Sequence, residues 1–171
     1  MKIQNTVIAD LDIVLQRYRD ASDYQRKHGY NLWPEFDRQM ITKEILEGLH
    51  WKMTEDEQVA CVFSVFYSDP VIWKEKDQDD AIYLHRIATN PEFKGRNFIS
   101  HIVQWSKIHA RENNRQYIRM DTWGDNDNLS GYYMKAGFKF LKKQHITKDE
   151  SLPPHYWGIY LNLFEIDLHV E

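Results

Sequence analysis

Residues 81–99 read AIYLHRIATNPEFKGRNFI and contain, in this order, a strand, a turn and the beginning of a helix. Residues 81–89 are mostly apolar and rich in β-branched and aromatic side chains, which favours a strand. Asn90 and Pro91 end that pattern because proline has no N–H to donate to a sheet. Beyond them, apolar side chains recur at helical spacing, so we predict a helix from about residue 95 to 113.

The turn between this strand and this helix has the features of an anion-binding site. The first N–H groups of a helix have no partner inside the helix, and the helix dipole makes this end electropositive. Lys94 and Arg96 add positive charge at the same place. The arrangement suits a pyrophosphate group, although these residues alone are equally compatible with an ordinary polar turn.

The rest of the chain divides into short strands and helices. Periodicity and breakers predict helices at 10–29, 35–47 and 126–136, and strands at 2–8, 49–54, 57–67, 117–123, 138–146 and 156–165. The stretch 68–80 is polar and acidic and contains a turn signal. Because a helix joins the strands at 81–89 and 117–123, we expect these two to form a right-handed parallel crossover. The expected fold class is α+β, with a mixed, mostly antiparallel central sheet flanked by helices on both faces.

Length and composition limit the class of protein. The 171 residues fit a single domain, 1–171, and 22 Lys and Arg against 26 Asp and Glu give a net charge of −4. We expect no nucleic-acid partner, because phosphate backbones need a concentrated basic face. Cys61 is the only cysteine, which excludes an internal disulfide. With no membrane-spanning or signal segment and no metal-binding histidine spacing, we expect a cytoplasmic protein without membrane or metal.

A second informative stretch, residues 126–138, reads NDNLSGYYMKAGF. Together with residues 81–99 and the order of elements, it resembles the GNAT superfamily of N-acetyltransferases. The later motif of that family is an Asn followed by a helix that ends in Tyr-x-x-x-Gly-Phe, and Asn126 and Tyr133 fall at its Asn and Tyr positions. From about residue 57 onward, most of the chain is similar to a bacterial small-molecule-type subgroup.

The resemblance implies acetyl-CoA as co-substrate, held where the strands at 81–89 and 117–123 splay apart. The family's pyrophosphate loop has Arg or Gln, two variable residues, Gly, one variable residue, then Gly or Ala. Lys94, Asn97 and Ile99 occupy the three fixed places here, and all three differ from the pattern. The residues implied in binding are Ile87, Ala88 and Thr89 for the pantetheine amides, Lys94, Gly95, Arg96, Asn97, Phe98 and Ile99 for the pyrophosphate, and also Asn126 and Tyr133.

The same resemblance assigns the general acid to Tyr133, which in the family faces the thioester sulfur and protonates the departing thiolate. A phenol is a neutral donor at pH 7 and suits that role. The alternative is a core aromatic whose hydroxyl is satisfied within the protein. Candidate bases for the amine are His85, Asp121 and Glu35, and His85 has the most suitable intrinsic pKa. A cross-strand pair on the surface is the alternative for His85, and ordering of the following loop is the alternative for Asp121.

The expected acceptor is a small-molecule amine that the sequence does not identify. A polyamine, an aminoglycoside-like drug, an amino acid and a protein N-terminus all remain open, as do a monomer and a homodimer. Aromatic side chains suited to a cationic or aromatic amine are Tyr30, Trp33, Phe36, Trp73 and Trp157. The competing hypothesis, motivated by Asn97 and Ile99, is a catalytically weak or inactive GNAT-fold module that senses acyl-CoA or binds a partner.

Overall fold

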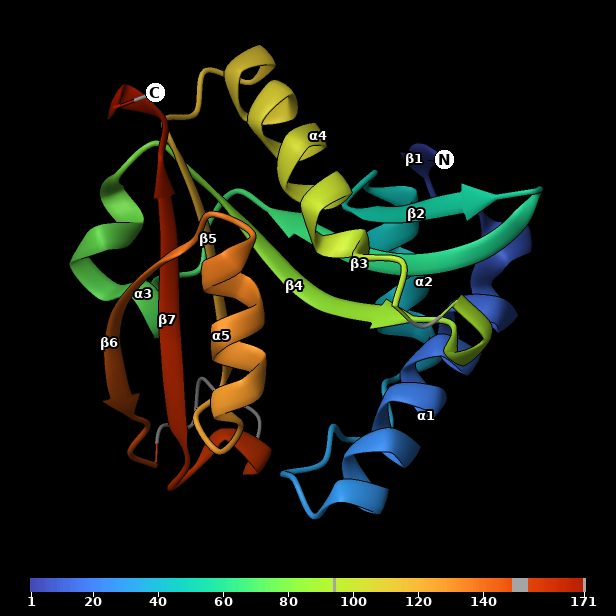
Figure 1. Ribbon diagram of the computed structural model, residues 1–171, viewed down its shortest axis with the longest axis horizontal. Helices are drawn as coiled ribbons and strands as arrows, with labels where there is room; N and C mark the ends of the chain where they lie inside the picture. The colour runs from blue at the N-terminus through green and yellow to red at the C-terminus, as the bar shows by residue number, and fades with distance from the viewer. Residues whose placement is uncertain (94, 149–153, 171) are drawn as a thin grey trace. The chain divides into compact units, whose positions relative to one another are not determined.

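The computed structural model describes residues 1–93, 95–148 and 154–170 (Figure 1). Contacts divide the chain into two compact units. Unit 1 comprises Met1–Val65 and His85–Phe98, and unit 2 comprises Phe66–Leu84 and Ile99–Glu171. The boundary crosses β3 at its last residue, the middle of β4 and the first turn of α4, so each unit contains part of these three elements.

The elements follow one another in the order that the sequence predicts, with additional short helical turns. The strands are β1 (Lys2–Asn5), β2 (His50–Glu55), β3 (Gln58–Phe66), β4 (Ala81–Thr89), β5 (Tyr117–Trp123), β6 (Lys139–His145) and β7 (Tyr160–Asp167). The α-helices are α1 (Leu11–His28), α2 (Arg38–Leu46), α3 (Pro70–Trp73), α4 (Phe98–Glu112) and α5 (Asp127–Lys135). Turns of 3-10 helix occur at Ile8–Asp10, Lys74–Gln78, Pro91–Phe93, Pro154–Tyr156 and Leu168–Val170.

Unit 1 is built on β1, β2, β3 and the end of β4, in that order, with α1 and α2 packed against them (Figure 1). The pairs β1–β2 and β2–β3 are antiparallel. Helix α1 carries Leu11, Val14 and Tyr18 at helical spacing, and all three are buried against side chains such as Val59 of β3. Gly29 ends this helix with a φ of 71°, a left-handed conformation that glycine adopts without strain.

A network of polar side chains is buried in unit 1. His50 of β2 is fully buried, with its Nδ1 2.8 Å from Thr6 Oγ1 and its Nε2 2.7 Å from Tyr18 Oη. Burial, together with the nearby Arg86 guanidinium, lowers the pKa of His50 to about 3. Arg86 itself forms an ion pair with Glu44 of α2. The imidazole is therefore neutral and belongs to the folded core.

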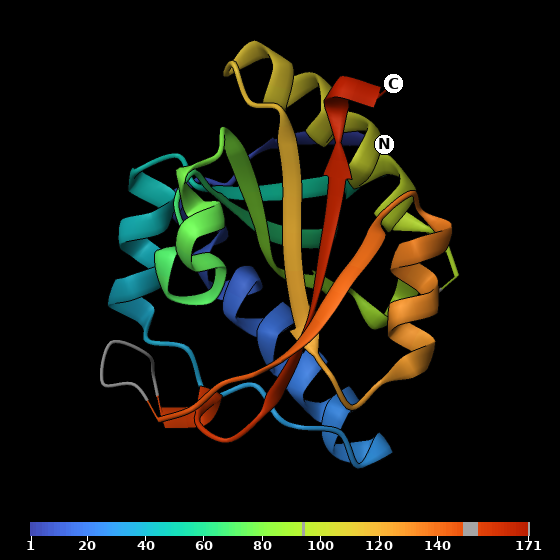
Figure 2. The same ribbon diagram turned by 90° about the vertical axis from the view of Figure 1, so that its left-hand side faces the viewer.

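Unit 2 is built on the beginning of β4, followed in space by β5, β7 and β6. The β4–β5 pair is parallel, and the β5–β7 and β6–β7 pairs are antiparallel. Along β7, Leu161 and Leu163 pack with Ile72 of α3, whereas Phe164 contacts the ring of Tyr133 of α5. Because strand side chains alternate between faces, α3 and α5 cover opposite faces of these strands (Figure 2).

Arg119 of β5 attaches the segment that precedes β4. Its fully buried guanidinium donates to Glu165 Oε2 at 2.8 Å, to Asp79 Oδ2 at 2.5 Å and to the carbonyl oxygen of Lys76 at 2.5 Å. The stretch 68–80, which the sequence shows only as polar and acidic, therefore forms α3 and a 3-10 turn. Sequence periodicity does not reveal that this stretch is structured, because the hydrogen bond from Arg119 to Asp79 joins residues 40 positions apart.

The predicted fold class and the parallel β4–β5 pair are confirmed. The strands at 81–89 and 117–123 have the predicted bounds. The strand predicted at 2–8 ends at Asn5, because Val7 N–H donates to the Asp10 carboxylate at 2.9 Å and begins a helical turn. A single domain over 1–171 stays a prediction.

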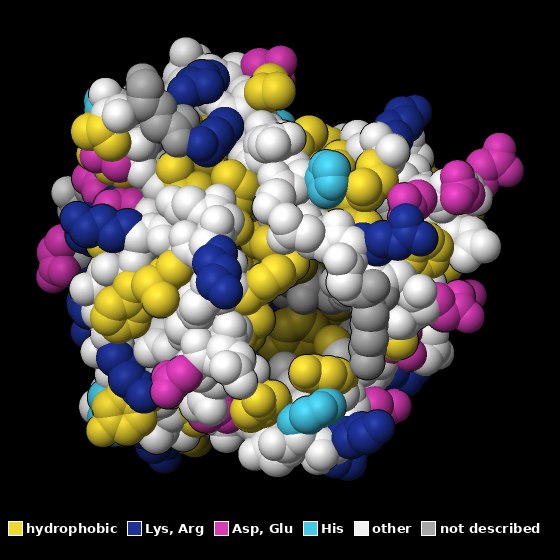
Figure 3. Space-filling view, viewed as in Figure 1, with side chains coloured by type: hydrophobic (Ala, Val, Ile, Leu, Met, Phe, Trp, Pro, Cys, Tyr) yellow, Lys and Arg dark blue, Asp and Glu magenta, His cyan; other side chains and the backbone are white. Residues whose placement is uncertain are grey.

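The described helices include no stretch that is both long and apolar enough to cross a bilayer. On the face drawn in Figure 3, Lys and Arg side chains are interspersed with acidic, apolar and polar ones. That nucleic acid and membrane are not partners stays a prediction.

Candidate active site

The pairing of β4 with β5 covers only the first part of both strands. Their parallel register runs from Ala81↔Tyr117 to Leu84↔Met120, within unit 2. The remaining residues of β4, 85–89, belong to unit 1, and the remaining residues of β5 pair with β7. The backbone groups of residues 87–89 are therefore outside the described β4–β5 ladder.

The backbone of β4 changes conformation at Arg86, which has a φ of 52°. A non-glycine residue in this region costs about 1–2 kcal/mol, and it persists where the surrounding structure over-determines it. Here the guanidinium is held by Glu44 and, at 3.1 Å, by Ser64 Oγ. The irregularity directly precedes residues 87–89. The sequence predicts no role for Arg86, because its ion pair with Glu44 joins residues 42 positions apart.

The side chains of residues 87–89 are engaged within unit 1. Ala88 is buried in the core formed by α1 and α2, and Thr89 Oγ1 lies 3.9 Å from Cys61 Sγ. Burial raises the pKa of the Cys61 thiol to about 12. A fully buried, protonated thiol is a poor nucleophile, so Cys61 is a core residue and not an acyl carrier.

The turn before α4 contains two left-handed backbone positions, Gly95 with a φ of 80° and Asn97 with a φ of 51°. Asparagine is one of the few non-glycine residues enriched in this conformation, so Asn97 substitutes for the glycine of the family pattern in backbone geometry. Arg96 is largely exposed and donates from Nη1 to Glu55 Oε1 at 3.3 Å. Lys94, also predicted to bind pyrophosphate, lies outside the described residues.

Helix α4 begins with two buried side chains, Phe98 and Ile99, which are 4% and 2% exposed. The Ile99 side chain therefore does not lie at the surface, and the predicted contribution of Ile99 is its backbone N–H. That N–H donates to the hydroxyl of Tyr132 on α5, with an N···O distance of 3.5 Å. No role for Tyr132 is predicted from the sequence, because a contact across 33 positions leaves no pattern there.

Helix α5 positions the two residues of the later motif. Asn126 caps the helix, and its Oδ1 accepts a hydrogen bond from Leu129 N–H at 3.0 Å. Tyr133 is only 7% exposed, with ring centroids 6.3 Å from Phe138 and 5.9 Å from Phe164. The cap explains one function of Asn126, while its contact with the cofactor and the role of Tyr133 stay predictions.

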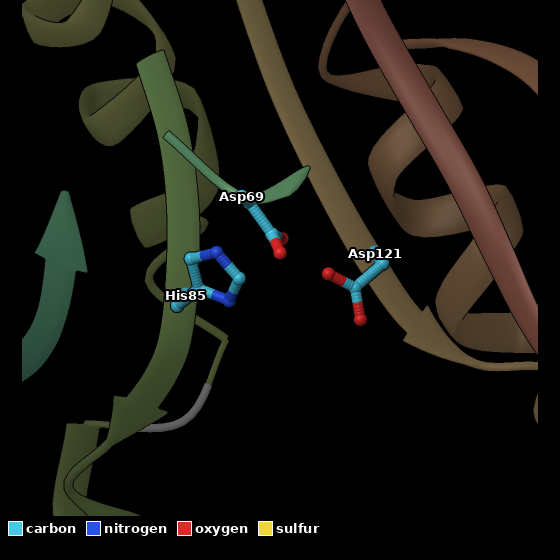
Figure 4. A group of neighbouring side chains, drawn as sticks. All are labelled: Asp69, His85 and Asp121. Carbon is cyan, nitrogen blue, oxygen red and sulfur yellow. The ribbon is translucent and has the colours of Figure 1, made fainter. Parts of the chain in front are cut away.

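The three candidate bases lie on different elements. His85 follows Leu84 on β4, Asp121 lies on β5, and Glu35 is exposed in the segment before α2. Figure 4 shows the side chains of His85 and Asp121 on their strands, together with Asp69 from the segment after β3. Carboxylate oxygens of Asp69 and Asp121 lie within 4.8 Å of one another in unit 2. The assignment of the base and the expected absence of a metal stay predictions.

Two of the aromatic residues predicted near the acceptor lie together in unit 1. The ring centroids of Trp33 and Phe36 are 5.9 Å and 4.8 Å from that of Tyr18. Trp73 is different, because it is 4% exposed and packs beside Tyr83 in the core of unit 2. Trp73 is therefore a core residue of unit 2, and its predicted place in the acceptor site stays a prediction.

Comparisons with known proteins agree on one family. The model of the acetyltransferase (GNAT) family matches residues 16–138. A curated relative, the uncharacterized N-acetyltransferase YesJ of Bacillus subtilis (strain 168), is 29% identical over 161 residues, covering 82% of this chain and 88% of that protein. A GNAT-family acetyltransferase structure from Streptococcus agalactiae 2603 has a TM-score of 0.75 at 20% identity, covering 97% of this chain and 94% of its own. YncA, a putative acetyltransferase from Salmonella typhimurium solved with acetyl-CoA, has a TM-score of 0.70 at 13% identity, covering 98% and 94%.

The described residues fit acetyl-CoA. A left-handed turn precedes a 15-residue helix whose first N–H groups attract anions. The inward side chains of Phe98 and Ile99 keep their bulk away from the surface at this end of the helix. Residues 87–89 lie outside the β4–β5 ladder, as strand-like pairing with pantetheine amides requires. With the family match over residues 16–138, these features identify the chain as a member of the acetyltransferase (GNAT) family and an acetyl-CoA-dependent N-acetyltransferase.

Proposed function

We propose that this enzyme transfers the acetyl group of acetyl-CoA directly to the primary amine of a small acceptor, with Tyr133 as general acid. The observation that carries the proposal is the β4–β5 register, which stops at Leu84↔Met120 although β4 continues to Thr89. A strand whose backbone groups are released from a ladder can pair with an extended ligand. The thioester supplies an activated acetyl group, and every other contribution below comes from the chain.

Two stretches of backbone are proposed to hold the cofactor. Residues 87–89 pair with the pantetheine amides, and one of their N–H groups polarises the acetyl carbonyl as negative charge develops on its oxygen. Residues 94–99 hold the pyrophosphate, chiefly through N–H groups at the N-terminus of α4. The left-handed φ values of Gly95 and Asn97 support this assignment, because such turns point successive N–H groups toward one place.

Tyr133 is proposed to donate its phenolic proton to the sulfur of the leaving thiolate. A buried ring packed on Phe138 and Phe164 has a fixed orientation, which favours directional proton transfer. Asn126 supports this role indirectly, because the hydrogen bond of its Oδ1 to Leu129 N–H fixes the start of the helix that carries Tyr133.

His85 is proposed as the base that removes a proton from the amine, directly or through water. It lies immediately before Arg86, where the backbone of β4 changes conformation, and two residues before the proposed pantetheine-binding stretch. Asp121 and Glu35 remain the competing bases, and the variants His85→Gln, Asp121→Asn and Glu35→Gln distinguish them. The true base is the one whose removal eliminates the acidic limb of the pH profile of kcat/KM.

The test of the acid compares wild type with Tyr133→Phe on a panel of primary amines. We expect kcat to fall about 100-fold for the variant, the typical contribution of a general acid. Tyr24→Phe is the matched control, since it removes another tyrosine hydroxyl from an exposed position on α1. A kcat for Tyr133→Phe within twofold of wild type would eliminate Tyr133 as the acid.

Measurements of acetyl-CoA binding by the same proteins distinguish the enzyme from the competing hypothesis, a catalytically weak or inactive module. Acetyl-CoA binding without turnover of any amine would favour a sensor. No binding at millimolar acetyl-CoA would exclude both the enzyme and the sensor.

The panel of primary amines should contain a polyamine, an aminoglycoside, amino acids and a peptide N-terminus, since each of these acceptors is still open. The oligomeric state, monomer or homodimer, and the proposed cytoplasmic location are tested separately by light scattering and by cell fractionation.

A further inference from the structure

We propose that Tyr132, the neighbour of the proposed acid, binds the cofactor's pyrophosphate through a hydrogen-bond relay that begins at the N-terminus of α4. In this arrangement the Tyr132 hydroxyl accepts a hydrogen bond from Ile99 N–H and donates its own proton to a phosphate oxygen. The inference rests on the proposed function, because it assumes that this end of α4 faces the pyrophosphate. It assigns a residue that the family motif at 126–138 does not include.

The first observation is the contact between the two helices inside unit 2. Ile99 is the second residue of α4, so its N–H has no acceptor within the helix. The acceptor is Tyr132 Oη, with an N···O distance of 3.5 Å. Ordinary N–H···O bonds are shorter, about 2.9–3.0 Å. The hydroxyl thus lies at the electropositive end of α4.

The second observation is that Tyr132 is accessible while the side chains beside it are not. Tyr132 is 40% exposed, whereas Ile99 is 2% exposed and Tyr133 is 7% exposed. Adjacent residues on a helix point about 100° apart, so the two tyrosines of α5 have different surroundings. Tyr133 packs on Phe138 and Phe164, and Tyr132 reaches toward α4. The Tyr132 hydroxyl therefore lies at the start of α4, while the Tyr133 ring lies in the core of unit 2.

The chemistry of a phenol fits the relay. A tyrosine hydroxyl accepts through its oxygen and donates through its proton at the same time. Accepting a bond from Ile99 N–H polarises the O–H, and a phosphate oxygen is a strong, charged acceptor for it. The helix dipole acts in the same direction, since it favours negative charge at this end. Asn97 and Ile99 replace the two small residues of the family loop, and Tyr132 supplies a donor beyond the backbone at this loop.

The experiment measures binding by calorimetry, with free CoA and with pantetheine, which lacks the pyrophosphate. The proteins are wild type, Tyr132→Phe and the control Tyr24→Phe, which removes a hydroxyl of similar exposure from α1. We expect Tyr132→Phe to weaken CoA binding about tenfold and to leave pantetheine binding within twofold of wild type. The control should bind both ligands like wild type.

The outcomes separate this inference from the function on which it rests. Binding of CoA by Tyr132→Phe within twofold of wild type would refute the relay. Equal losses for CoA and pantetheine would also refute it, because the contribution of the Tyr132 hydroxyl would then not depend on the pyrophosphate. If wild type itself fails to bind CoA, the proposed function fails, and the relay fails with it. Thermal unfolding of each variant verifies that it is folded.

Discussion

Both ring nitrogens of His50 bond to side chains inside unit 1, one to Thr6 and one to Tyr18. Burial, with a further contribution from Arg86, lowers the pKa of His50 from 6.5 to about 3. Between these two pH values the unfolded chain binds a proton that the folded chain does not. The corresponding stability is complete above pH 6.5 and is lost as the pH falls toward 3.

We predict that His50→Gln flattens the acid side of the stability profile. Between pH 7 and pH 5, wild type should lose about 1–2 kcal/mol more of its free energy of unfolding than the variant loses. Urea titrations at both pH values measure this difference. His109 and His155, whose pKa values burial also lowers, are present in both proteins and cancel. An identical pH dependence for the two proteins would contradict the assignment.

A site residue could be predicted from the sequence only where its contacts lie close to it along the chain. Asn126 and Tyr133 belong to a continuous motif, so they were predicted together with the helix that carries them. Tyr132 and Arg86 were given no role, because what distinguishes them is a partner 33 positions away and one 42 positions away. A single sequence contains periodicity and local motifs, and neither records a tertiary hydrogen bond.

Among the elements, the loop from β5 to α5 is held very closely to β7. Gly124 N–H donates to the Tyr160 carbonyl oxygen at 2.7 Å. The carbonyl oxygen of Gly124 accepts a hydrogen bond from Lys143 Nζ, also at 2.7 Å. A Cβ at this position would lie 3.0 Å from the Tyr160 oxygen and 2.8 Å from Lys143 Cε. The lysine end can move, but the backbone oxygen cannot do so without shifting β7.

We predict opposite effects for alanine at the two glycines near this loop. Gly124→Ala should lower the free energy of unfolding by about 1–3 kcal/mol, because the added methyl group overpacks the loop. Gly131 lies inside α5, and a Cβ added there would meet no atom within 4 Å beyond its chain neighbours and the backbone of its own helix, so Gly131→Ala should raise stability by about 0.5–1 kcal/mol. Urea unfolding of both variants measures the pair. A stability for Gly124→Ala equal to that of wild type would contradict the close approach.

The helices and strands also differ in whether local sequence or distant contacts determine them, and only the first kind was predicted. The bounds of β4 and β5 were predicted correctly, because apolar runs with breakers at their ends are visible in the sequence. Helix α3 was not predicted, because its order depends on the burial of Ile72 and Trp73 and on hydrogen bonds from Arg119 of β5 to the residues that follow it. Local propensity in this polar stretch contains neither cause.

For the whole molecule, the function follows from how one parallel pair is connected. Parallel strands need a crossover, and α4 provides it between β4 and β5. The N-terminus of that helix therefore follows the end of β4 along the chain, after the turn that begins at Asn90. This arrangement was predictable from the order of elements and the family resemblance. The acceptor was not predictable, because loops with little periodicity determine specificity.

The most direct test is a crystal structure of this enzyme with CoA bound. We predict that pyrophosphate oxygens lie within about 3.2 Å of backbone N–H groups of residues 95–99, and that the sulfur lies beside the Tyr133 hydroxyl. A diphosphate bound away from the start of α4, or a Tyr133 hydroxyl directed away from the sulfur, would contradict the account.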